Sequence, residues 1–171
     1  MQWKHKTITA ALSLLLVAVC APLTRAQQPA AETLVGPAQT QRLLPPSVYF
    51  KGQSATTQIR NSGGVHFADG TYLLAVLVDT SGYSSEVAQK YQAYLITENP
   101  IHVSGKPLAA GIYGVGFVGN QFLVMDVGAH TLLSVMSSTD AEMKRPRPLQ
   151  VIGSHGSYRL YEGRRFVTLD K

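Results

Sequence analysis

Short runs of apolar and β-branched residues alternate with polar positions from Ser47 onward, and Gly, Asn, Ser and Pro separate the runs. This spacing predicts antiparallel strands joined by tight turns. Only residues 84–92, capped by Ser84, and residues 139–142, with capping-box spacing, predict short helical turns. We therefore expect an all-β fold: a single meander-like antiparallel barrel or sandwich with at most one or two short helical turns. The short, sequential hairpins favour the barrel.

The clearest hairpin spans residues 112–127 and closes at Gly119-Asn120, where a leading glycine suits a type II′ turn. This turn predicts the pairs Phe117–Phe122, Val115–Val124, Tyr113–Asp126, Gly116–Leu123, Gly114–Met125 and Ile112–Val127. Both faces of the hairpin are then apolar, which indicates burial on both sides or one side lining a cavity or a partner surface. Gly114 and Gly116 form a trough, filled either by a neighbouring side chain or by a ligand.

A second hairpin is predicted at the C-terminal end, with its turn at Glu162-Gly163. This register places Tyr158, Leu160, Val167 and Leu169 on one face. On the other face, Arg159 lies opposite Phe166 and Tyr161 opposite Arg164. An arginine over an aromatic ring is typical of a solvated outer surface.

The segment Ile-His-Val-Ser-Gly-Lys-Pro-Leu-Ala-Ala-Gly-Ile-Tyr-Gly, residues 101–114, is rich in turn residues. Gly105 and Gly111 are expected to supply positive-φ turns, and Pro107 is expected at a sheet edge because it lacks an N–H donor. The segment resembles the G-K-x-L-x-A-G-x-Y hairpin of uncharacterised secreted bacterial β-proteins. The resemblance implies a β-rich, exported bacterial protein and assigns no site residue.

The first 26 residues have the pattern of a secretory signal peptide: basic Lys4 and Lys6, an uncharged apolar run over residues 8–21, and a small residue, Ala26, before the expected cut. The apolar run is shorter than the roughly 20 residues that a membrane-spanning helix needs. We therefore expect a periplasmic or secreted protein with no transmembrane span after cleavage. The alternative is a lipid anchor on Cys20, although Val19 stands where a lipoprotein signal has a small residue.

Removal of the leader changes the composition. The formal charge falls from +5 to +2, and the only Cys and the only Trp of the chain are lost. So mild a net charge gives no support for nucleic-acid binding. Residues 27–46 show no sustained period and are rich in Gln, Ala, Pro and Thr, which predicts a flexible spacer before a β-domain of residues 47–171.

Four histidines remain after cleavage, and none has the spacing of a metal-binding pair. The best candidate for chemistry is Asp126 with His130, which His66 and Asp69 could join, as a metal or catalytic centre. Asp126 is expected on an otherwise apolar face, where it needs a partner such as the Tyr113 hydroxyl or a backbone amide. The alternative is a structural role, in which the Asp126 carboxylate only forms a hydrogen bond with such a partner and takes no part in catalysis or metal binding. No other cofactor is indicated.

Tyrosines gather around the loop of residues 80–92. Tyr83, Tyr91 and Tyr94 make this loop the first candidate for a recognition surface, because tyrosine is an amphipathic contact residue. The alternative is the ordinary preference of tyrosine for strands. With Tyr113, Gly114 and Gly116, these residues form the predicted ligand-binding set.

Two classes of function follow. The first is a non-enzymatic, exported binding or envelope-associated domain whose partner is a small apolar ligand, a glycan or an envelope protein, with the oligomeric state left open. The second is a small hydrolase or metal-dependent enzyme centred on Asp126 and His130. This second hypothesis requires His66, Asp126 and His130 to meet within metal-bond distance.

Overall fold

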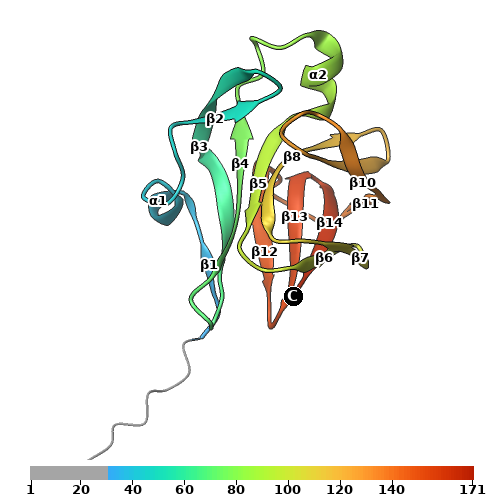
Figure 1. Cartoon of the computed structure of the whole chain (residues 1–171). Helices are drawn as coiled ribbons and strands as arrows, with labels where there is room; N and C mark the ends of the chain where they lie inside the picture. The colour runs from blue at the N-terminus through green and yellow to red at the C-terminus, as the bar shows by residue number, and fades with distance from the viewer. Residues whose placement is uncertain (1–30) are drawn as a thin grey trace, which may run out of the picture.

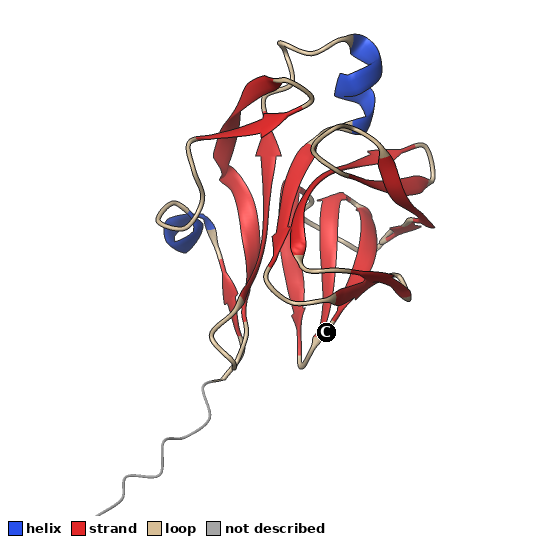
Figure 2. Ribbon diagram, in the orientation of Figure 1, coloured by secondary structure: helices blue, strands red, loops and turns tan. Residues whose placement is uncertain are grey.

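The computed structural model describes residues 31–171, which fold into two antiparallel sheets with two short helices (Figures 1 and 2). The larger sheet contains β1 (Thr33–Val35), β3 (Gln53–His66), β4 (Tyr72–Val78), β5 (Ala93–Thr97), β8 (Gly111–Val118), β9 (Gln121–Met125) and β10 (Thr131–Met136), with β2 (Ser47–Phe50) paired to β3. The smaller sheet contains β12 (Arg147–Ser154), β13 (Ser157–Gly163), β14 (Arg165–Asp170), β6 (Ile101–Val103) and β7 (Lys106–Leu108), with β11 (Ser138–Thr139) paired to β14. The helices are α1 (Pro37–Thr40) and α2 (Ser85–Lys90).

Neither sheet closes on itself within residues 31–171, because each strand order has two distinct ends. The predicted all-β fold with short helical turns is confirmed, and of its two forms the structure has the sandwich rather than the barrel. The preference for a barrel was wrong because consecutive strands do not all pair with each other. After β5 the chain crosses to the smaller sheet, forms β6 and β7 there, and then returns to the larger sheet as β8.

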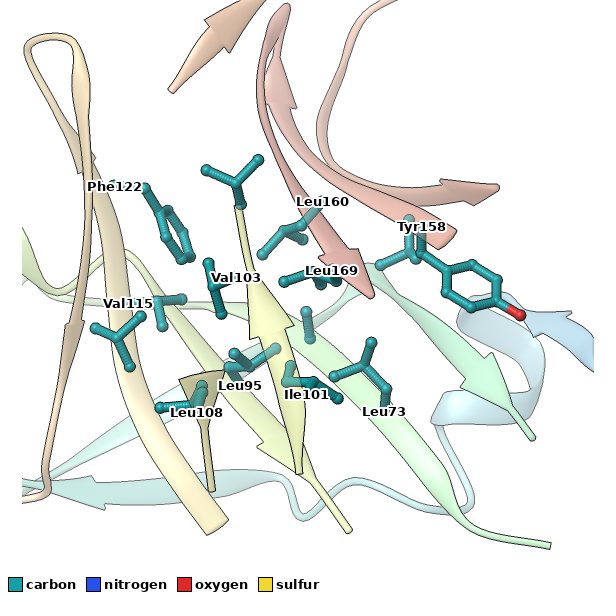
Figure 3. Packing of buried hydrophobic residues seen from close by; sticks show 14 of the residues in the cluster. Leu73, Leu95, Ile101, Val103, Leu108, Val115, Phe122, Tyr158, Leu160 and Leu169 are labelled. Atoms are coloured by element: carbon teal, nitrogen blue, oxygen red, sulfur yellow. The ribbon is translucent and has the colours of Figure 1, made fainter. Parts of the chain in front are cut away.

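The space between the sheets is filled by the main hydrophobic core (Figure 3). Leu73 and Leu95 of the larger sheet meet Val103, Leu160 and Leu169 of the smaller one, and each is at most 1% exposed. Burying one such aliphatic side chain stabilises the fold by about 1.5–3 kcal/mol. This core joins the two sheets without any disulfide among the described residues.

A second core covers the opposite face of the larger sheet. Because side chains alternate across a strand, Val76 and Tyr94 point away from the main core and pack beneath β2 and α2. The hairpin β8–β9 contributes to both cores, with Val115 and Val124 in the first and Met125 in the second. The predicted two-sided burial of this hairpin is thus confirmed.

The register of β8–β9 also follows the prediction, with Phe117 opposite Phe122 and Gly114 opposite Met125. Gly119 has φ +59°, as a type II′ turn requires at its first position. Pro107 lies on β7, the last strand of the smaller sheet, and Gly105 has φ +81°. Gly111 does not have the predicted positive φ. Its lack of a side chain leaves space for the Tyr113 ring, because a Cβ there would lie 2.8 Å from the Tyr113 hydroxyl oxygen.

The C-terminal hairpin turns one residue later than expected, at Gly163-Arg164. Tyr161 therefore faces Phe166, and Glu162 faces Arg165. The one-residue shift leaves the faces unchanged, so Tyr158, Leu160, Val167 and Leu169 share the core side as predicted. Arg159 still lies 4.6 Å above the Phe166 ring, as a diagonal neighbour.

The N-terminal part of the domain differs from the prediction of a flexible spacer. From residue 33 the chain pairs with β3 as β1 and then forms α1, and Leu44 is only 6% exposed. A three-residue strand and a four-residue helix are too short to produce a hydrophobic period, which explains why the sequence pattern missed them.

The predicted helical turn at residues 139–142 does not form: Thr139 ends β11, and a turn follows in which the Glu142 amide donates to Asp140 Oδ1 at 3.1 Å. The short helix around Ser84 is confirmed as α2. None of the helices formed by residues 31–171 has the length and hydropathy needed to span a membrane. The predicted signal peptide, including Cys20, lies outside the described residues.

Candidate functional site

The tyrosines of the predicted recognition surface lie largely inside the protein. Tyr91, Tyr94 and Tyr113 are 0%, 7% and 8% exposed, and Tyr83 is half-buried. Tyr91 stacks on Phe50 with ring centroids 3.9 Å apart, and Tyr83 meets both rings edge-on. Tyr83, Tyr91 and Tyr94 belong to the second core and Tyr113 to the main core, so these residues do not form the open surface that the sequence predicted.

The glycine trough is filled by the protein itself. A Cβ atom at Gly114 would lie 2.3 Å from the Phe50 ring, and one at Gly116 would lie 2.1 Å from the carbonyl oxygen of Lys90. Of the two occupants considered for the trough, the structure therefore has the neighbouring groups: the β2 aromatic ring and the end of α2.

The hydroxyl of Tyr91 is buried and has no hydrogen-bond partner among residues 31–171. Burial raises the pKa of this phenol far above its ordinary value. A buried hydroxyl that lacks a partner costs about 1–3 kcal/mol. We expect Tyr91→Phe to increase the free energy of unfolding by about 1 kcal/mol, measured by urea denaturation followed by circular dichroism.

Tyr83→Phe is the matched control, because the Tyr83 hydroxyl lies 3.0 Å from the carbonyl oxygens of both Phe50 and Gln53. Its removal is expected to lower the free energy of unfolding by about 1 kcal/mol. A loss of stability in Tyr91→Phe equal to that in Tyr83→Phe would show that the Tyr91 hydroxyl has a partner after all.

Asp126 and His130 are close together, but they form a turn and not a buried site. Asp126 Oδ1 accepts from the amides of Gly128 and His130 at 2.9 Å each, and Oδ2 lies 2.9 Å from His130 Nδ1. The hydrogen bond to the His130 side chain, followed by that to its amide, lowers the pKa of Asp126. The carboxylate thus finds backbone amides as partners, while Tyr113 donates to the Ala109 carbonyl.

His66 lies far from this turn. It ends β3 and stacks on Tyr72, whereas the 126–130 turn bonds through the Val127 carbonyl to the amide of Lys51, just before β3 begins. Asp69 is also elsewhere, paired with Lys171 at 2.5 Å. No three His, Cys, Asp or Glu side chains of the described chain are grouped as metal ligands would be. The convergence that the enzyme hypothesis requires is therefore contradicted.

A different site lies where the two sheets meet, between β1 and β12. We call it the seam groove: a surface cavity of about 290 Å³ lined by residues 34–37, Arg60, Ser62, Gly63, Arg147 and residues 149–152. Each of β1 and β12 is the end strand of its sheet, and β3, which pairs with β1, also contacts β12. Gly63 lines the groove between β1 and β12: a Cβ there would lie 3.4 Å from the Val151 amide nitrogen and 3.6 Å from the Val35 carbonyl oxygen.

Arg60 reaches the groove because β3 is interrupted. The register of β3 against β4 shifts between Gln58 and Ser62, so residues 59–61 protrude. Ser62 Oγ lies 2.5 Å from the Ile59 carbonyl oxygen and 2.6 Å from Thr40 Oγ1 of α1. Ser62 donates to the Ile59 carbonyl, and the hydroxyl groups of Ser62 and Thr40 share a hydrogen bond, which fixes the bulge that carries Arg60.

Arg147 enters the groove from the first position of β12, opposite Gly163. Both arginines are exposed, and neither forms an ion pair with any acidic residue in the 31–171 range. Leu34 and Ile152 beside them are 44% and 42% exposed. The groove thus combines two guanidinium groups with an apolar wall.

A larger hollow, of about 750 Å³, lies on the other side of the bulge and is lined by residues 56–61 and Asp79. Its walls come almost entirely from one strand, and Asp79 is held by the Ser81 amide at 3.0 Å. It is the outer surface of the bulge, and Ile59 is the only aliphatic side chain among its lining residues.

Comparisons of this chain with protein-family models, with curated proteins and with solved structures found no match. The resemblance of residues 101–114 to secreted bacterial β-proteins stays a prediction. Any assignment of function therefore depends on the chemistry of the site.

Proposed function

We propose that this protein is an exported, non-enzymatic binding domain that holds an anionic, partly apolar ligand in the seam groove. The observation that carries the proposal is a pair of arginines, Arg60 and Arg147, that have no acidic partner within residues 31–171 and line the same groove as exposed Leu34 and Ile152. A guanidinium group binds a carboxylate, sulfonate or phosphate through a planar fork of donors. The cations favour such a ligand over a neutral apolar molecule or an uncharged glycan.

The volume of the groove supports a small ligand or one part of a larger one, because ligand pockets usually begin at roughly 300 Å³. The bulge that carries Arg60 is braced by buried Thr40 and Ser62, so the backbone at one of the two cations is fixed before a ligand arrives. Such preorganisation reduces the entropic cost of binding.

A fluorescence titration with 8-anilinonaphthalene-1-sulfonate tests the proposal, since this probe joins a sulfonate to apolar rings. We expect the double variant Arg60→Gln with Arg147→Gln to bind it at least tenfold more weakly, because a hydrogen bond to a charged group contributes about 1.5–3 kcal/mol. Arg42→Gln is the control: Arg42 is exposed but lies outside the groove, and its loss is expected to change the affinity less than twofold. Equal affinities of wild type and the double variant would refute the proposal.

A further inference from the structure

The positive charge of the groove continues onto the neighbouring surface. Lys144 and Arg145 precede β12 in an exposed loop, and Arg164 lies at the β13–β14 turn. Arg164 Nε donates to the Met143 carbonyl at 3.2 Å, and Arg147 pairs with the residue before Arg164. The loop and the turn therefore form one surface, which we call the basic corner: Arg60, Lys144, Arg145, Arg147 and Arg164.

This corner accounts for the net charge of the domain. Beyond residue 26 the sequence has twelve Lys and Arg residues and ten acids. Five of these cations lie at the basic corner; Asp140 and Glu142 precede Lys144 in the same loop, and Asp79 lines the hollow next to Arg60. Asp140 is already engaged, since its carboxylate accepts from the Glu142 amide and the Tyr161 hydroxyl. The rest of the domain then has seven cations and seven acids, so the excess of positive charge lies at this corner.

We propose that the basic corner docks on an anionic phospholipid bilayer, with a lipid headgroup phosphate between Arg60 and Arg147 and an acyl segment against Leu34 and Ile152. This inference rests on the proposed function, because it names the ligand of the same groove. Clustered Lys and Arg residues are attracted to an anionic membrane surface, and each adds to the affinity. The two exposed aliphatic side chains next to the cations match the boundary between headgroups and acyl chains.

An acidic peptide strand is a poorer match to this surface. A peptide that extends a sheet needs a regular row of backbone donors along the free edge. Pro148, the second residue of β12, has no N–H, and the β12–β13 register shifts between Arg147 and Gln150. The cations are also spread over a loop and a turn rather than along one strand. A broad anionic surface complements that arrangement better than an extended chain does.

Vesicle flotation at physiological ionic strength tests the inference, with vesicles of phosphatidylcholine alone or with a quarter of phosphatidylglycerol. We expect the wild-type domain to float only with the anionic vesicles. Lys144→Gln with Arg145→Gln is expected to weaken this binding about 30-fold, from the usual contribution of two cations, and to leave the binding of 8-anilinonaphthalene-1-sulfonate unchanged. Arg60→Gln with Arg147→Gln is expected to weaken both. Lys51→Gln with Arg42→Gln, two exposed cations outside the corner, should weaken neither.

Equal flotation with both vesicle types, or no effect of the Lys144 and Arg145 substitutions, would overturn the inference. Competition by a 20-base-pair DNA duplex as strong as that by phosphatidylglycerol would also overturn it, in favour of unspecific polyanion binding. If the soluble probe binds through Arg60 and Arg147 but no vesicle does, the lipid inference fails while the proposed function stands. If the soluble probe is insensitive to both arginines, the proposed function itself fails.

Discussion

Replacing Gly116 by alanine is expected to lower the free energy of unfolding by about 3 kcal/mol or more, at the upper end of the cost of overpacking. The new methyl group would lie 2.1 Å from the carbonyl oxygen of Lys90 and 2.9 Å from its carbonyl carbon. These are backbone atoms at the end of α2. The amide of Tyr91 bonds back to Val87, and that of Gln92 bonds to Val115, so this backbone has little freedom to move. Urea denaturation followed by circular dichroism measures the loss.

Gly82→Ala is the matched control for this substitution. A Cβ at Gly82 would lie 3.5 Å from the Gln53 side chain, an ordinary contact, and its φ is not in the left-handed region. We expect a change within about 0.5 kcal/mol, as for most surface positions. A Gly116→Ala protein as stable as the Gly82→Ala protein would mean that α2 does not rest on β8, and the trough would again be open to a ligand.

Replacing Phe50 by alanine is expected to cost about 3–5 kcal/mol, the usual range for a fully buried phenylalanine. Phe50 is 0% exposed, stacks on Tyr91 and fills the space above Gly114. Its removal would leave a cavity in the second core, and the neighbouring rings would lose their packing partner. The same denaturation experiment gives the magnitude.

The preceding residue provides the control. Tyr49 is the neighbour of Phe50 on β2 but is 61% exposed, because alternate side chains of a strand point to opposite faces. Tyr49→Ala is expected to change stability by about 0.5 kcal/mol or less. If both substitutions had the same small effect, β2 would not cover the larger sheet, and Phe50 would not be part of a second core.

The strands and their local registers could be predicted because turn chemistry acts over a few residues. Gly119-Asn120 determines the β8–β9 pairing without reference to the rest of the chain. The C-terminal turn was misplaced by one residue because glycine can occupy more than one position of a tight turn. Gly163, with φ +62°, opens that turn rather than closing it.

The tyrosine cluster was misplaced because its covering residue comes from elsewhere in the chain. The sequence indicated that something packs on Gly114, but it did not indicate that Phe50 of β2 does so. The alternation of apolar and polar residues along a strand indicates whether a face of the sheet is apolar. It does not indicate which distant element covers that face.

The seam groove was missed for the same reason. Arg60 and Arg147 are far apart in the sequence, and each alone resembles an ordinary surface cation. A small net charge also hid a local excess of positive charge. The available signals were the run Lys144-Arg145-Pro146-Arg147 and the interruption of polar and apolar alternation at residues 59–61.

The central claim is that the ligand binds in the seam groove, and mapping the bound probe on ¹⁵N-labelled protein tests it most directly. On addition of 8-anilinonaphthalene-1-sulfonate, we predict that amide shift changes concentrate at residues 34–36, 60–63, 147 and 149–152. Changes that concentrate instead around Tyr83 and Tyr91, or at the 126–130 turn, with the groove unaffected, would contradict the account.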